Sequence, residues 1–195
     1  MGDLFAQPDG ATPLTPEEQR ELIPAHIAYR RELNEAEQEN IVRAQDWALR
    51  RRRRDVLSEK FIKELHKRML GDVWRWAGDF RRTERNLGIP HHEIPVALRQ
   101  LLEDTKAWIQ LNSYPPDEIA VRFHHRLALI HPFPNGNGRH ARLIADLLVM
   151  QLGQKRFSWG RANLQQAGDV RRRYIDALHA ADNHDIGPLL EFARL

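Results

Sequence analysis

The stretch HPFPNGNGRHAR, which runs from His131 to Arg142, carries the strongest fold signal in the sequence. Residues 117–130, directly before it, repeat apolar side chains every three or four positions and predict a helix with one buried face. Residues 143–151, directly after it, continue the same period. We therefore expect the stretch to form a tight turn between two buried helices.

Two glycines bracket Asn137 inside this turn. Because Gly136 and Gly138 carry no Cβ, backbone N–H groups can converge there. These donors lie where the next helix begins, so the helix dipole adds positive potential, an arrangement typical of phosphate sites. Arg139 and Arg142 are three residues apart, so they share a helix face and suit a di- or triphosphate.

His131 lies at the start of the same turn. An imidazole is a common general base for the proton of a hydroxyl group. A base, an anion cradle and two arginines together indicate nucleophilic attack on phosphorus, with the developing charge held by fixed donors. The alternative is a structural turn in which His131 caps a carbonyl and the arginines lie on the surface. The complete set of residues favours phosphorus chemistry.

Helical patterns cover most of the remaining chain. Thr15 and Pro16 suit the N-cap and the first position of a helix. Further helices are predicted at residues 30–50, 56–71, 95–111, 171–181 and 186–193. Glycine and proline punctuate residues 80–95, where we expect a β-hairpin or an extended flap. The sequence therefore predicts an all-α fold with one small β-hairpin.

Composition excludes several classes of protein. The chain has 195 residues, of which 42% are hydrophobic, enough for one globular domain with a small appendage. Its apolar runs are too short to cross a bilayer and its N-terminus lacks the pattern of a secretion signal, so we expect no membrane contact. Because there is no cysteine, disulfides and thiolate metal sites are excluded, and a cytoplasmic location fits best.

The net charge is +3, and part of this excess lies in the five consecutive arginines Arg50–Arg54. A block of this kind could bind nucleic acid. No aromatic residue interleaves the arginines, so a solvated surface is the favoured interpretation and nucleic acid the less favoured partner.

HPFPNGNGRHAR resembles the signature of the Fic domain, HPFx(D/E)GNGRxxR. The resemblance extends upstream to WAGDFR and the flap, and downstream to RRYIDALHAADNHD. It implies a Fic-type helical bundle over residues 56–195, preceded by an irregular arm at 1–15 and a helical extension at 16–55. It also implies the activity of most Fic proteins, the transfer of AMP from ATP to a Ser, Thr or Tyr hydroxyl of a target protein.

The resemblance assigns roles to individual residues. His131 would be the base that activates the target hydroxyl, and Phe133 would anchor the turn in the core. Nucleotide contacts would come from Gly136, Asn137, Gly138, Arg139, Arg142, Tyr174, Asp182, Leu87 and Gly88. Among these, Arg142 would take the γ-phosphate. Tyr174 and Asp182 would line the adenine and ribose pocket, where the family more often has Asn at the second place. The flap at Leu87–Gly88 would lie over nucleotide and target.

One position departs from the family's pattern. The family's acidic residue before GNG binds Mg²⁺, whereas this chain has Asn135. An amide oxygen ligates magnesium without bringing a charge, so we expect a weak metal site with most of the ion's ligands from the nucleotide. This departure implies weaker adenylylation, a different nucleotide or donor, or a lower rate.

An inhibitory helix is the second implied feature. Many Fic proteins carry the pattern (S/T)xxxE(G/N), and residues 35–40, EAEQEN, match its last two positions. The resemblance implies that Glu39 pairs with Arg142 and obstructs the γ-phosphate until it is displaced. The alternative is an ordinary acidic helix face, and both interpretations stay open.

Other candidates and functions are weighed against this one. The pairs His91–His92 and His124–His125 have neither HxxxH nor HExxH spacing, so we expect no dedicated metal site there. The rival function is a Fic-fold module that senses nucleotide or binds a partner with little catalysis. The sequence names no target protein and leaves a homo-oligomer open.

Overall fold

The computed structural model describes residues 14–50, 55–161 and 168–195. Within these ranges the chain forms eight α-helices, two short 3₁₀ helices and no strand, which confirms the all-α prediction. The elements in chain order are α1 (Pro16–Gln19), α2 (Arg30–Arg50), α3 (Glu59–Leu70), η1 (His91–Glu93), α4 (Ile94–Gln110), α5 (Pro116–Ile130), α6 (Asn137–Gln151), η2 (Trp159–Arg161), α7 (Asp169–Asp182) and α8 (Gly187–Arg194). The expected arm at 1–15 and the arginines 51–54 lie almost entirely outside the described residues.

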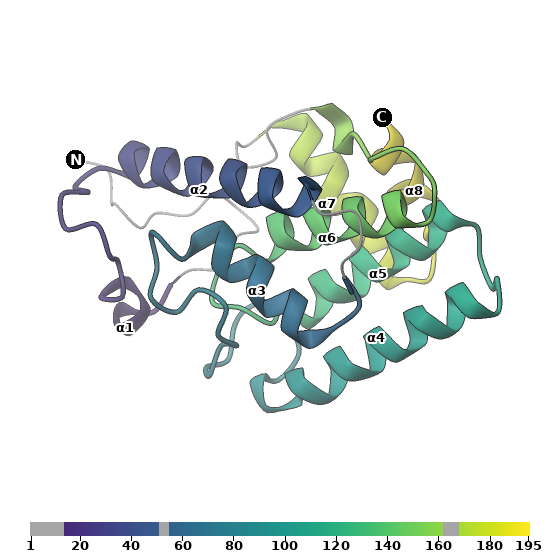
Figure 1. Ribbon diagram of the computed structural model, residues 1–195, viewed down its shortest axis with the longest axis horizontal. Helices are drawn as coiled ribbons and strands as arrows, with labels where there is room; N and C mark the ends of the chain where they lie inside the picture. The colour runs from purple at the N-terminus through teal and green to yellow at the C-terminus, as the bar shows by residue number, and fades with distance from the viewer. Residues whose placement is uncertain (1–13, 51–54, 162–167) are drawn as a thin grey trace.

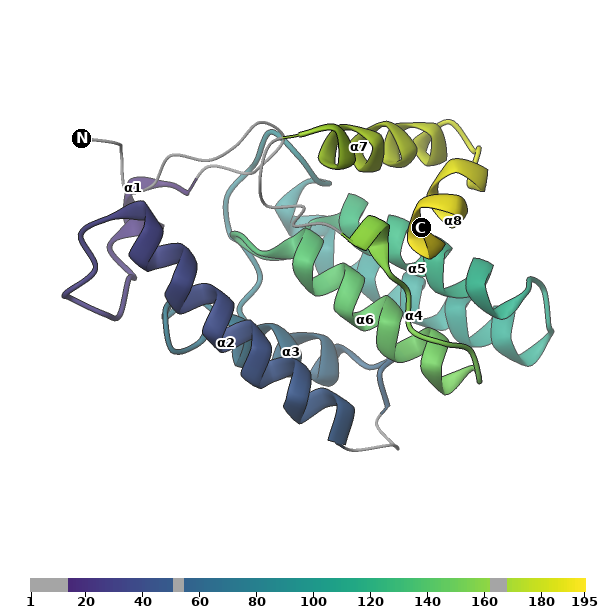
Figure 2. The same cartoon turned by 90° about the horizontal axis from the view of Figure 1, so that it is seen from above.

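Helices α5 and α6 pack together at the centre of the molecule (Figure 1). Helix α4 lies along α5, and Figure 2 shows α2 with α3 on one side of the central pair and α7 with α8 on the other. No helix of the described ranges has the length and apolarity needed to span a bilayer.

The position of α6 follows from its sequence. All seven residues from Leu143 to Val149 are buried, so this helix is enclosed on every side rather than amphipathic. The only charged member of the run is Asp146, whose carboxylate accepts hydrogen bonds from Arg156 Nε at 2.7 Å and Trp159 Nε1 at 2.9 Å. The two bonds satisfy a carboxylate that would otherwise be costly to bury.

Helix α2 packs along α3 through one face. Its buried residues are Leu33, Glu37, Asn40, Ile41, Ala44 and Ala48. Ahead of it, α1 begins with the expected N-cap Thr15 and Pro16, and an isolated antiparallel bridge joins Leu22 to Trp74. The N-terminal helices are therefore packed against the rest of the chain, and a domain boundary at residue 56 stays a prediction.

The expected β-hairpin at residues 80–95 is wrong, because no strand forms there. A single buried guanidinium replaces strand pairing: Arg81 donates from Nε to His131 O at 2.7 Å, from Nη1 to Thr83 O at 3.0 Å and from Nη2 to Ile89 O. Its backbone N–H also donates to Pro132 O at 2.9 Å. Carbonyls that a hairpin would pair across the ladder are thus satisfied by one side chain. We call residues 80–90 the flap.

The flap is also held from the N-terminal side. Arg85 forms an ion pair with Glu18 of α1, and both side chains are largely buried. Trp76 Nε1 donates to Glu18 O at 3.3 Å. Helix α1 therefore contributes to the position of the flap.

Three histidines, His66, His124 and His140, are completely buried. His140 donates from Nε2 to Ile62 O at 2.9 Å, and burial lowers its pKa to about 4 against the opposing effect of that hydrogen bond. Burial likewise lowers the pKa values of His66 and His124. The core therefore holds its imidazoles in the neutral form at pH 7.

We predict that the protein loses stability in mild acid. An unfolded imidazole has a pKa of about 6.5, so below that pH the unfolded chain binds more protons and stability falls until pH drops past the folded value of about 4. His140 alone costs about 2 kcal/mol between pH 7 and pH 5. Urea unfolding at both pH values measures this loss, and His140→Gln should reduce it. The exposed control His26→Gln should leave it unchanged, and an equal loss in all three proteins contradicts the prediction.

Candidate active site

His131 ends α5 in the left-handed conformation, with φ 53° and ψ 58°. Its Nδ1 lies 3.3 Å from Ala128 O; a carbonyl can only accept, so Nδ1 carries the hydrogen and Nε2 is the atom that takes up a proton. Burial lowers the pKa of His131 to about 4, and the positive charges of Arg81 and Arg85 act in the same direction. The imidazole is therefore neutral at pH 7, as a general base must be.

The turn after His131 is locked by Asn137. Its Oδ1 accepts from Phe133 N at 2.9 Å and its Nδ2 donates to Phe133 O at 2.8 Å. The Asn137 side chain is buried, so only its backbone amide remains to face a nucleotide. Phe133 is itself fully buried, in line with its implied role as the anchor of the turn.

His66 of α3 stabilises the turn by contacts with its backbone and with Phe133, a role that was not predicted from the sequence. Its Nε2 donates to Asn135 O at 2.9 Å, its Nδ1 accepts from Gly78 N at 3.0 Å, and its ring stacks on Phe133 with 3.7 Å between centroids. The signal was present, because His66 follows Ile62 by four residues and so lies on the buried face of the predicted helix.

The first turn of α6 presents backbone donors. The first bond of the helix runs from His140 N to Gly136 O at 3.0 Å, so the amides of Asn137, Gly138 and Arg139 precede the ladder. Within the described part of the chain, no acceptor binds these three amides. A Cβ on Gly138 would meet only an Arg142 nitrogen, at 3.6 Å, which leaves room for a ligand beside the backbone.

Gly136 shapes the turn, and its expected contact with nucleotide stays a prediction. Its amide donates to Asn135 Oδ1 at 2.6 Å and is not available to phosphate in this arrangement. Its φ is +79°, and a Cβ would lie 2.6 Å from Leu70 Cδ1. Glycine is needed here because the turn adopts a left-handed conformation against the core.

Arg139 forms an ion pair with a residue of helix α2. Its Nη1 lies 2.7 Å from Glu37 Oε2, while Glu37 Oε1 accepts from Trp74 Nε1 at 2.8 Å. Burial raises the pKa of Glu37, but the Arg139 guanidinium and the Trp74 indole outweigh it and lower the pKa below its usual value. An ionised, buried carboxylate therefore neutralises one of the two arginines of the turn.

The expected pair between Glu39 and Arg142 is not formed in the structure. Glu39 is exposed, whereas Glu37 points inward, because residues two apart on a helix differ by about 200° in direction. An inhibitory role of Glu39 stays a prediction that requires its side chain to move toward the turn. The carboxylate that reaches the turn from α2 is Glu37, and it binds Arg139.

Arg142 lies against α7. Its guanidinium carbon is 5.3 Å from the centroid of the Tyr174 ring, and the buried Tyr174 hydroxyl lies 3.0 Å from His124 Nε2. The structure thus brings Tyr174 to the turn. The Asp182 carboxylate lies 2.7 Å from His125 Nε2, and His125 is about 9 Å along α5 from His131. The expected role of Asp182 in the adenine and ribose pocket stays a prediction.

The flap touches His131 directly. Gly88 has a φ of +98°, and a Cβ there would lie 2.6 Å from His131 Cβ and 3.2 Å from Ile130 O. Leu87, beside it, is 40% exposed. The flap therefore lies against the Cβ of His131, and Gly88 allows the close approach.

Asn135 does not fit a protein-held magnesium ion in this arrangement. Its Oδ1 accepts from the Gly136 amide, and a nitrogen of the Arg139 guanidinium lies 3.4 Å away. Magnesium prefers carboxylate and phosphate oxygens, and a neutral oxygen beside an arginine offers neither charge nor space. The role of Asn135 as a weak magnesium ligand stays a prediction that requires its side chain to turn.

The arrangement as a whole can hold a phosphate chain beside a base. Three backbone amides, two guanidinium groups and a neutral imidazole come from one turn and the helix that follows it. Such donors stabilise charge that develops on phosphate oxygens, because they are fixed before the reaction begins.

Comparison with known proteins supplies independent findings. The sequence profile of the Fic/DOC family matches residues 56–149. Protein adenylyltransferase Fic of Aedes aegypti is 32% identical over 142 residues, and the same protein of Drosophila grimshawi is 36% identical over 137. These matches cover 71% and 68% of this chain and 27% of each relative, so the chain spans about a quarter of the curated relatives.

Solved structures give the same result for the fold. Fic-1 of C. elegans, residues 134–508 with E274G, superposes with a TM-score of 0.63 at 27% identity, over 91% of this chain and 52% of that one. The BepC protein of Bartonella tribocorum, with bound AMPPNP, superposes with a TM-score of 0.67 at 18% identity, over 92% and 97% of the two chains.

We predict that Gly88→Ala destabilises the protein more than Gly153→Ala does. Both glycines have a positive φ, so both variants carry the cost of a left-handed alanine. Only at Gly88 does the new Cβ meet other atoms, whereas nothing lies within 4 Å at Gly153. The difference in the free energy of unfolding should be about 1–3 kcal/mol, measured by urea unfolding. Equal losses would show that the flap does not lie against His131.

Proposed function

We propose that this chain, in which residues 56–149 match the Fic/DOC family profile, transfers AMP from ATP to a Ser, Thr or Tyr hydroxyl of a target protein. The observation that carries the proposal is the neutral His131 beside the amides of the first turn of α6. Relatives named protein adenylyltransferase and a neighbour with bound AMPPNP support the choice of reaction and of nucleotide.

In the proposed reaction the acceptor oxygen attacks the α-phosphorus of ATP. A bond forms between that oxygen and phosphorus, the bond from phosphorus to the bridging oxygen of the β-phosphate breaks, and pyrophosphate leaves. His131 Nε2 takes the proton from the hydroxyl, since Nδ1 already donates to Ala128 O. A base with a pKa of about 4 is unprotonated at pH 7 and ready to act.

The other residues of the turn hold the phosphates. The amides of Asn137, Gly138 and Arg139 face the negative charge, aided by the dipole of α6. The two guanidinium groups, those of Arg139 and Arg142, bind the remaining phosphate oxygens, with Arg142 assigned to the γ-phosphate. No step depends on a metal ligand from Asn135, and any magnesium would be held mainly by ATP.

We further propose that Glu37 restrains the enzyme. Its ion pair occupies Arg139, so ATP must displace a buried carboxylate before this arginine can bind phosphate. The carboxylate also places negative charge where the phosphates would lie, and like charges repel strongly at a site shielded from water. This assignment transfers the inhibitory role expected for Glu39 to a residue two positions earlier.

Two features, Asn135 and the Glu37–Arg139 ion pair, also favour the rival function, a module that binds nucleotide with little transfer of AMP. Asn135 removes the charge of a metal ligand, and Glu37 neutralises Arg139. ATP binding without any labelled product, both in the wild type and after removal of Glu37, would favour that function. A cytoplasmic location stays a proposal that rests on the absence of cysteine.

We predict that His131→Ala abolishes AMP transfer. A general base contributes about 10²- to 10⁴-fold to such a rate, so ATP labelled at the α-phosphate should leave label on protein only with an intact His131. The assay incubates purified chain with a cell lysate, and His179→Ala, an exposed histidine on α7, serves as the control. Equal labelling by wild type and His131→Ala would exclude the proposed role.

We predict that Glu37→Gln raises labelling and Glu39→Gln does not. Loss of the Glu37 charge releases Arg139, and couplings of this kind change affinity by about 5- to 150-fold. The matched control changes the same chemical group on the exposed face of the same helix. Thermal unfolding of both variants shows whether they are folded. If labelling rose with Glu39→Gln alone, the restraining residue would be Glu39, as the motif indicated, and not Glu37.

A further inference from the structure

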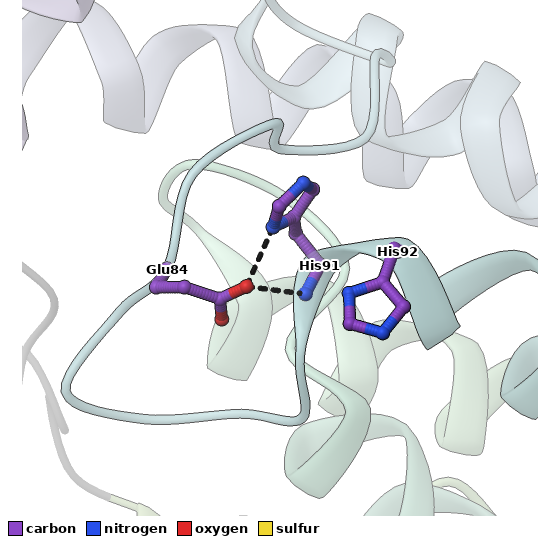
Figure 3. A group of neighbouring side chains, drawn as sticks. All are labelled: Glu84, His91 and His92. Carbon is purple, nitrogen blue, oxygen red and sulfur yellow. Dashed lines mark hydrogen bonds and ion pairs between the residues drawn. The ribbon is translucent and has the colours of Figure 1, made fainter.

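Glu84, His91 and His92, none of which belongs to the α5–α6 turn, gather where the two ends of the flap segment 84–91 meet (Figure 3). One ligand atom from each of the three residues lies within 4.8 Å of the others. The two histidines form the beginning of η1, and the glutamate comes from the flap seven residues before His91. The side chains are 60%, 39% and 71% exposed, so an ion from solution can reach all of them.

The carboxylate of this cluster has polar partners on both of its oxygens. Glu84 Oε1 lies 2.6 Å from His91 Nδ1 and accepts from His91 N at 3.2 Å. Its other oxygen lies 3.9 Å from Arg81 Nη1. Partners that orient a ligand in this way are typical of metal sites.

We propose that Glu84, His91 and His92 bind one Zn²⁺ ion or a similar borderline transition-metal ion. Two imidazoles and one carboxylate are a donor set that zinc favours, with a remaining position for water. Ligand atoms on a tetrahedral zinc ion lie about 3.3 Å apart. The observed spread of up to 4.8 Å is closed by small rotations of exposed side chains. Magnesium is disfavoured, because it prefers oxygen ligands only.

The sequence pattern led us to expect no metal at His91–His92. Adjacent histidines diverge by about 100° on an α-helix and by about 120° on a 3₁₀ turn. The two rings nevertheless lie 5.7 Å apart between centroids, and the third ligand comes from the flap. Glu93 adds a further carboxylate oxygen 3.8 Å from His92 Nε2. The spacing rule considers the two histidines alone, whereas the fold of the flap brings Glu84 to them.

A metal ion at this position would tie the flap to η1. Glu84 and His91 enclose residues 85–90, which contain Gly88, the residue that lies against His131. A bond at both ends of this segment would restrict the motion of the flap beside the base. The flap, held by Arg81 and by the Arg85–Glu18 ion pair, would gain a further and reversible anchor.

The test is a zinc titration of the tag-free, EDTA-treated full chain at pH 7, in competition with a chromophoric chelator. We expect one equivalent to bind and each of Glu84→Gln, His91→Gln and His92→Gln to weaken it at least about tenfold, since even outer partners of a metal cost that much. The control His26→Gln changes an exposed histidine outside the cluster and should bind as the wild type does.

A second measurement follows the mobility of the flap. Hydrogen exchange of residues 85–90 should slow on addition of zinc in the wild type and in His26→Gln, and stay unchanged in His92→Gln. Zinc affinity that none of the three substitutions lowers overturns the assignment of the site. Zinc binding that does not slow hydrogen exchange overturns the proposal that the metal anchors the flap. Neither measurement depends on transferase activity.

Discussion

The turn between α5 and α6 depends on one imidazole from another helix. His66 is bonded on both ring nitrogens, to Asn135 O and to Gly78 N, and its face lies on Phe133. One neutral side chain thus joins α3, the turn and the segment that leads to the flap. A protonated ring could not accept from Gly78 N, so the burial that keeps His66 neutral also keeps the three segments in register.

Charge is distributed around the turn in a consistent way. The imidazoles near it are neutral because they are buried, the arginines are positive, and Glu37 supplies the opposing charge from α2. A carboxylate in that position would be costly without its two partners, Arg139 and Trp74. Helix α2 therefore contributes to the electrostatics of the site as well as to the packing of the core.

Local patterns predicted the helices well, because periodicity and capping act between near neighbours. Helices expected at 95–111 and 117–130 occur at Ile94–Gln110 and Pro116–Ile130. Three features escaped prediction for one reason: their partners are distant in the sequence. Arg81 binds the carbonyl of His131, 50 positions later, at the start of the α5–α6 turn. His66 binds a residue 69 positions later, and the face of α2 that meets Arg139 is set by packing on α3.

The buried Arg81 anchor of the flap has an evolutionary consequence. Because Arg81 fixes the path of the flap through backbone carbonyls, that path is insensitive to the identity of most side chains between its ends. Surface residues such as Arg82 and Leu87 can drift under selection for new partners while the course of the main chain beside His131 is retained. Within this one short segment, the side chains that recognise a partner can therefore change independently of the main-chain path that the reaction requires.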